Sequence, residues 1–76
     1  MNIQELIQFL KLLVKENEDV TPFTRVVCSG DEEGNSYGSA YAITGPDGKG
    51  FQTEQKNLVN HEYDCPDDVV VIWPLA

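Results

Sequence analysis

The chain has 76 residues with 13 acidic and 5 basic side chains, so its formal net charge is −8. This length has room for one small hydrophobic core, and we therefore expect residues 1–76 to form a single domain. The charge argues against direct binding to DNA, RNA or anionic membranes, which requires clustered Lys and Arg. Hydrophobic residues make up 41% of the chain, which is typical of a folded domain and not of a disordered acidic tail.

The first segment has the pattern of an amphipathic helix. Asn2 and Glu5 are spaced as a capping box. The polar run 16–19 and then Pro22 end the pattern, so the sequence predicts a helix over residues 3–16. Its apolar residues recur at helical spacing and form one stripe, which consists of Ile3, Leu6, Ile7, Leu10, Leu13 and Val14.

The segment after the helix has the pattern of a sheet. Residues 23–29 are typical of a strand, and residues 30–38 are rich in Gly, Asn, Asp and Ser, as in a loop. Residues 39–43 and 51–53 flank a Gly-Pro-Asp-Gly turn at 45–48. In such a turn Pro presets one φ angle and the last Gly tolerates a positive φ. We therefore expect these two segments to form a hairpin.

Residues 69–73 form the last predicted strand. The run is apolar without alternation, which is typical of a strand buried on both faces, and we expect it to be central. The predicted fold is α+β, with the N-terminal helix packed on an antiparallel or mixed sheet of three or four strands. The helix covers one face, so the other needs residues 54–66, which show no clear pattern, or a second copy of the chain.

Both ends of the chain and its acidic loop resemble a group of small proteins encoded by phages and prophages. The resemblance rests on the N-terminal amphipathic helix, on segment 29–35 (Ser-Gly-Asp-Glu-Glu-Gly-Asn) and on segment 70–74 (Val-Val-Ile-Trp-Pro). Gly30 stands where a second Ser is common in the group, and residues 40–66 are not covered. The resemblance implies a compact α+β fold and a viral accessory role, and for such a protein we expect the host bacterial cytoplasm as its location. It transfers no catalytic residue.

The acidic loop has three interpretations. Asp31, Glu33 and Asn35 alternate as at the start of a calcium loop, but Gly34 comes too early and Ala42 stands where a bidentate Glu would close the site. A solvated turn explains the same residues without a ligand. The third interpretation is a recognition loop for a basic partner. We expect the partner-binding residues to be Asp31, Glu32, Glu33, Asn35 and Tyr37.

The aromatic residues are divided between core and surface. We expect Trp73 and Phe51 in the core. Tyr37 lies in a Gly-flanked loop and either anchors a partner or packs on its own loop.

Metal binding and catalysis have weaker signals. Cys28, His61, Asp64 and Cys65 include ligand types that zinc accepts, but they lack a Cys-x-x-Cys pair or a second His. An acidic chain provides little positive charge to activate a thiolate. We therefore expect no enzymatic activity, no cofactor and no metal site, and reduced thiols as in a cytoplasmic protein.

The sequence therefore favours a non-enzymatic phage accessory protein that binds and modulates a host or anti-phage defence protein. Acidic residues cluster at 16–19, 31–33 and 62–68, and such charge attracts a basic surface, including a groove that normally holds nucleic acid. One alternative is an oligomer that sequesters a nucleotide or a metal ion. Another is a structural protein of the virion.

Overall fold

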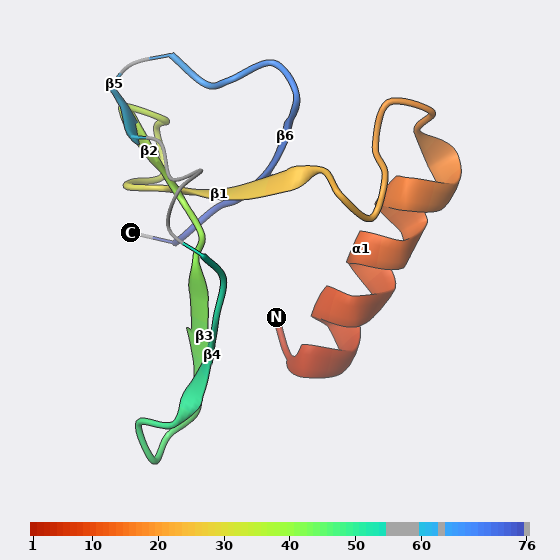
Figure 1. Ribbon diagram of the computed structural model, residues 1–76. Helices are drawn as coiled ribbons and strands as arrows, with labels where there is room; N and C mark the ends of the chain where they lie inside the picture. Colours follow the sequence, from red (N-terminus) through yellow and green to blue (C-terminus); the bar gives the residue numbers. More distant parts are fainter. Residues whose placement is uncertain (55–59, 63, 76) are drawn as a thin grey trace.

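A computed structural model describes residues 1–54, 60–62 and 64–75 of the chain (Figure 1). The described elements are α1 (Ile3–Glu16), β1 (Arg25–Ser29), β2 (Ser36–Ser39), β3 (Ala42–Thr44), β4 (Gly50–Gln52), β5 (Asn60–Glu62) and β6 (Val69–Ile72). Four strands form a mixed sheet in the order β5-β2-β1-β6, and β3 and β4 form a separate pair. The predicted α+β class is confirmed.

The helix begins and ends where the sequence predicts. The Glu5 amide donates to Asn2 Oδ1 at 2.8 Å, and the Asn2 amide donates to Glu5 Oε1 at 3.1 Å. At the other end Asn17 has extended backbone, and its amide donates to the Leu13 carbonyl at 3.1 Å. The capping box satisfies N–H groups in the first turn that have no partner within the helix.

The four-stranded sheet is built around β1. Antiparallel β2 lies on one side of β1, and parallel β6 lies on the other. The prediction that residues 69–73 form a central strand is therefore wrong, because β6 is at the edge of the sheet. Its four residues are half-buried. A continuous apolar run indicates apolar surroundings on both faces of a strand, and it does not require a neighbouring strand on both sides.

One face of this sheet holds the core. Val27 is fully buried, and Ser29 and Tyr37, which lie opposite each other in the β1–β2 register, are 6% and 8% exposed. The Trp73 ring meets the Tyr37 ring edge-on, with centroids 5.9 Å apart and an interplanar angle of 85°. This geometry suits the charge distribution of two aromatic rings. The prediction that Trp73 is a core residue is wrong, because it follows edge strand β6 and is 53% exposed, with its ring packed against the buried Tyr37.

The hairpin forms around the predicted turn, but its first strand is Ala42–Thr44 and not 39–43, because residues 36–39, most of which were expected in a loop, form β2 of the four-stranded sheet. Its turn closes with a 3.0 Å hydrogen bond from the Gly48 amide to the Gly45 carbonyl, and Gly48 has a φ of 81°. The described residues of both strands are exposed. The hairpin projects away from the four-stranded sheet (Figure 1). Phe51, expected in the core, is 87% exposed, because the strand that carries it pairs with β3 alone.

The helix does not pack on the sheet, contrary to prediction. No residue of α1 is buried, and Ile3 in the apolar stripe is 78% exposed. Figure 1 shows α1 standing apart from the four-stranded sheet. The linker 17–24 consists of hydrogen-bonded turns, closed by bonds from the Val20 amide to the Asn17 carbonyl and from the Thr24 amide to the Thr21 carbonyl, each 3.1 Å long. These turns set the direction of the chain between α1 and β1.

Val27 is the residue whose truncation tests this core. We expect Val27→Ala to lower the free energy of unfolding by about 2 kcal/mol, because it removes fully buried methyl groups and leaves a cavity. Ile43→Ala in the exposed hairpin should change it by less than about 0.5 kcal/mol. Urea denaturation of both variants measures the difference. Equal effects would contradict the assignment of the core to β1.

Candidate functional site

The candidate site is the acidic loop, defined as residues 30–35, which joins β1 to β2. Because β1 and β2 are neighbouring antiparallel strands, the loop lies at the end of the sheet where β1 finishes. Its two ends are joined by a 2.8 Å hydrogen bond from the Gly30 amide to the Ser36 carbonyl. The loop is thus fixed at its base by the same pairing that forms the sheet.

The Asp31 carboxylate organises the loop from within. Its Oδ1 atom accepts hydrogen bonds from the backbone amides of Glu33, Gly34 and Asn35, at 3.0, 2.8 and 3.1 Å. Its Oδ2 atom accepts a 2.8 Å bond from the Asn35 side-chain amide. Short polar side chains that bond to nearby backbone in this way are typical of tight turns. The Asp31 side chain therefore holds the backbone of the loop in one shape.

These bonds also favour the charged form of Asp31. The side-chain hydrogen bond from Asn35 is the largest cause that lowers the pKa of Asp31, and the backbone amides of Asn35, Gly34 and Glu33 lower it further. Desolvation acts in the opposite direction but is outweighed. Donors that point at a carboxylate stabilise its negative charge, so Asp31 is ionised at neutral pH.

Gly34 seats the loop on the core. Its φ of 77° lies in the left-handed region, which glycine adopts without steric cost. A Cβ atom at this position would lie 3.3 Å from Cη2 of Trp73 and would overlap the Tyr37 hydroxyl. The backbone at Gly34 therefore lies directly against the Tyr37–Trp73 pair. Both the φ angle and the lack of space require glycine here.

Ser29 strengthens the junction between strand and loop. Its buried hydroxyl donates to the Asp31 carbonyl oxygen, and the Asp31 amide makes a longer bond of 3.4 Å to the same hydroxyl. The loop is therefore attached to the core at two places, through Ser29 at its start and through Gly34 near its end.

The five residues predicted to bind a partner lie in different surroundings. Glu32 and Glu33 are exposed, and the Glu33 carboxylate accepts a 3.5 Å hydrogen bond from the Asn35 side-chain amide. Asp31 and Asn35 bond to each other and maintain the loop. The expectation of Tyr37 as an exposed anchor is wrong, because its ring is buried beneath the loop.

Sequence reasoning missed the supporting residues Gly34, Ser29 and Trp73. A signal for the first was present, because Asp followed three residues later by Gly-Asn is typical of a turn held by an aspartate side chain. The contact of Gly34 with Trp73 joins residues far apart in the sequence, and no local pattern indicates it.

The calcium interpretation of the loop does not fit this geometry. Asp31 Oδ1 faces three N–H donors, whereas a cation site needs oxygen atoms turned toward the ion. Among the described residues, no three His, Cys, Asp or Glu side chains gather into a group that could hold a metal ion. The His61 side chain of the zinc interpretation lies outside the described residues.

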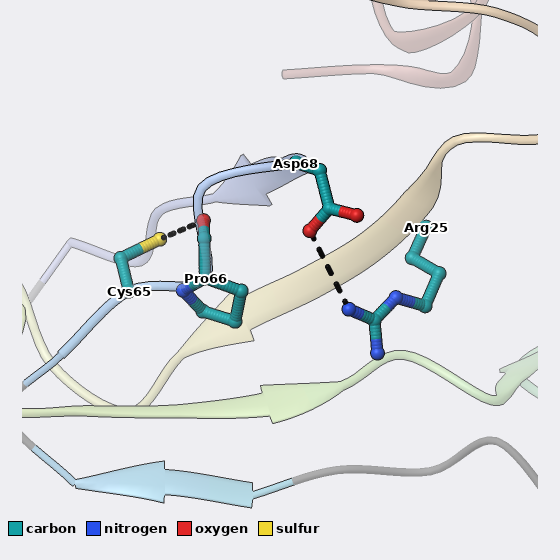
Figure 2. Close-up of polar contacts among 4 residues, drawn as sticks. All are labelled: Arg25, Cys65, Pro66 and Asp68. Carbon is teal, nitrogen blue, oxygen red and sulfur yellow. Dashed lines mark hydrogen bonds and ion pairs between the residues drawn. The ribbon is translucent and has the colours of Figure 1, made fainter.

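The two cysteines are free thiols and both are exposed. Cys28 lies in β1, and the Cys65 thiol donates to the Pro66 carbonyl at 3.5 Å (Figure 2). They therefore do not form a disulfide.

The acidic residues at 62–68 do not lie together as one group beside the acidic loop. Asp68 forms a 3.6 Å ion pair with Arg25 at the start of β1 (Figure 2). The acidic loop follows Ser29 at the opposite end of the same strand. Both partners of the ion pair are substantially exposed, at 39% and 83%, so it adds little stability. Glu62, in contrast, lies opposite Ser36, the residue directly after the acidic loop, so residues of the 62–68 cluster lie at both ends of the sheet.

Within the described part of the chain, no helix has the length and apolarity needed to cross a bilayer. No protein-family model, curated protein or solved structure matches the chain.

The role of Asp31 predicts a pH-dependent stability. A lowered pKa in the folded state means that this contribution is complete above the unfolded-state pKa of about 3.9 and is lost as the pH falls through the lower folded-state pKa. We expect Asp31→Asn, which turns an amide donor toward the Asn35 amide, to have a lower melting temperature than wild type at pH 7.

The difference in melting temperature between wild type and Asp31→Asn should shrink toward pH 2, and thermal denaturation at both pH values measures it. Glu32→Gln removes a charge from an exposed position of the same loop and should melt as wild type does. An equal difference at both pH values would show that the Asp31 charge does not stabilise the loop.

Proposed function

We propose that the chain is a non-enzymatic phage accessory protein that binds a host or anti-phage defence protein through its acidic loop. The observation that supports this best is a loop whose backbone is held by Asp31 and which leaves Glu32 and Glu33 exposed. The proposed partner offers a basic surface to these two carboxylates.

The loop is suited to recognition because it is ordered before a partner arrives. Asp31 fixes the backbone, and Gly34 rests on buried Tyr37. A surface that is already in its binding shape loses less conformational entropy on association. A partner then meets two adjacent carboxylates in a fixed arrangement.

The charge of the whole chain supports the same proposal. With a net charge of −8, the protein attracts a basic surface over a distance set by the ionic strength. Complementary charge raises the rate of encounter and disfavours acidic competitors. A groove lined by Lys and Arg, such as one that normally holds nucleic acid, provides this complement.

The phage role rests on the resemblance of the helix, of segment 29–35 and of segment 70–74 to small phage proteins, and for such a protein we expect the host cytoplasm as its location. Two alternative functions are sequestration of a nucleotide or metal ion and a structural role in the virion. No contact among the described residues favours either of them.

Charge reversal in the loop tests the proposal. We expect Glu32→Lys/Glu33→Lys to reduce capture of a partner from bacterial lysate at least about tenfold, equivalent to about 1.4 kcal/mol of binding free energy. The measurement is a quantitative pulldown with the tagged full chain at two salt concentrations. Wild-type capture should fall as salt rises, because salt screens exposed charges.

The matched control is Glu18→Lys/Asp19→Lys, which makes the same change in net charge at two exposed residues after α1. It should retain most of the wild-type capture. If both double variants lose capture equally, net charge and not the acidic loop is responsible. If neither loses capture, the loop is not the binding surface.

A further inference from the structure

The folded chain exposes more surface than a monomer of its mass should. Its accessible surface is 6527 Å², whereas a folded monomer of 8.5 kDa exposes about 4,700 Å². The excess is about 1,800 Å² per chain. Permanent dimers bury about 1,000–2,500 Å² on each subunit. The excess therefore falls within the range of surface that a permanent dimer buries on each subunit.

Part of this excess lies on the face of the four-stranded sheet opposite Val27, here called the open face, which is apolar over β1 and β6 and continues through Gly38 and Ser36 of β2 to Asn60 of β5. Side chains alternate along a strand, so Val26 and Cys28 of β1 lie on the face opposite buried Val27. The register places Val70 beside Val26 and Ile72 beside Cys28, and Val26, Val70 and Ile72 are half-buried. Cys28 is exposed although its strand is central. No described segment covers this open face at Cys28.

The second uncovered surface is the apolar stripe of α1. The helix has 14 residues and is about 21 Å long, whereas four strands span about 14 Å between the outer two. The helix is thus long enough to cover the apolar part of the open face, which is formed by the neighbouring strands β1 and β6. In the structure it stands apart from its own sheet, beyond the turns of residues 17–24 (Figure 1).

Charge makes the helix a suitable cover for a sheet of an acidic protein. Its charged residues are Glu5, Lys11, Lys15 and Glu16. These balance, so the net charge of −8 lies entirely outside α1. The α1 helix of a second copy therefore brings an apolar stripe without net charge to the open face. The negative charge that would repel the first copy lies on the rest of the second chain.

We propose that the protein is a homodimer in which α1 of each copy covers the open sheet face of the other copy. Each protomer contributes one helix and receives one, so the arrangement closes with two-fold symmetry and buries two apolar surfaces per chain. The acidic loop belongs to the opposite face of the sheet, where Gly34 contacts Tyr37. Dimerisation leaves that loop accessible.

The two cysteines provide a direct test of this interface. Cys65→Ser leaves Cys28 as the thiol on the open face, and Cys28→Ser leaves exposed Cys65 as the control thiol. Light scattering should give twice the monomer mass of 8.5 kDa for the full chain. At dimer-forming concentration Cys28 should react with a maleimide at least about tenfold more slowly than Cys65. Dilution should restore its reactivity.

Two charge-matched helix variants complete the experiment. Leu10→Glu adds a charge within the apolar stripe and should give a monomer whose Cys28 reacts as fast as Cys65. Gln8→Glu adds the same charge on the polar side of α1 and should remain a dimer. Circular dichroism of both variants reports whether the helix is retained. If Leu10→Glu does not fold, the concentration dependence of wild-type mass and Cys28 reactivity decides the question.

Three results would overturn the proposal. The first is a wild-type monomer in which Cys28 reacts freely, and the second is a monomer in which Cys28 is protected, which would mean that α1 covers its own sheet. The third is a dimer in which Cys28 stays reactive. None of these depends on the acidic loop, because Glu32→Lys/Glu33→Lys should leave the mass unchanged.

Discussion

The contact between the acidic loop and the packed face of the sheet is the interaction on which the rest of the structure depends. Gly34 lies against Tyr37 and Trp73, and Trp73 follows directly after β6. The contact therefore connects the end of β1, the start of β2 and the end of β6 at one place. Because the loop that closes the core also carries Glu32 and Glu33, formation of the core and presentation of the charge occur together.

This arrangement gives the two faces of the sheet different roles. The face of Val27 and Tyr37 is closed by the chain itself, with the acidic loop at its edge. The face of Cys28 is apolar over β1 and β6 and is exposed at Cys28, and the unpartnered apolar stripe of α1 is long enough to cover this part. In our account the loop meets a basic partner and the open face meets a second copy, so the two associations use different surfaces.

Features set by local chemistry were predictable from the sequence. The helix limits follow from Asn2 and Glu5 at one end and the polar run at the other. The hairpin follows from the turn at 45–48, and the position of the acidic loop follows from its composition. Each of these depends on residues that lie within a few positions of one another.

Features set by distant contacts were not predictable in this way. Tyr37 sits in a loop-like sequence but is buried, because β2 begins at Ser36 and places the ring beneath Gly34 and beside Trp73. The edge position of β6 depends on which strands pair. The direction of α1 depends on turns in the linker 17–24. None of these three leaves a periodic signal in the sequence.

Backbone ¹⁵N relaxation of the full chain tests the central claim that the acidic loop is an ordered surface attached to the core. The account predicts order parameters of about 0.85 for Glu33, Gly34 and Asn35, equal to those of β1. Asp31→Asn should lower these values and leave those of β1 unchanged. Order parameters below about 0.6 across the wild-type loop would contradict the account, because a loop that moves freely presents no fixed pair of carboxylates.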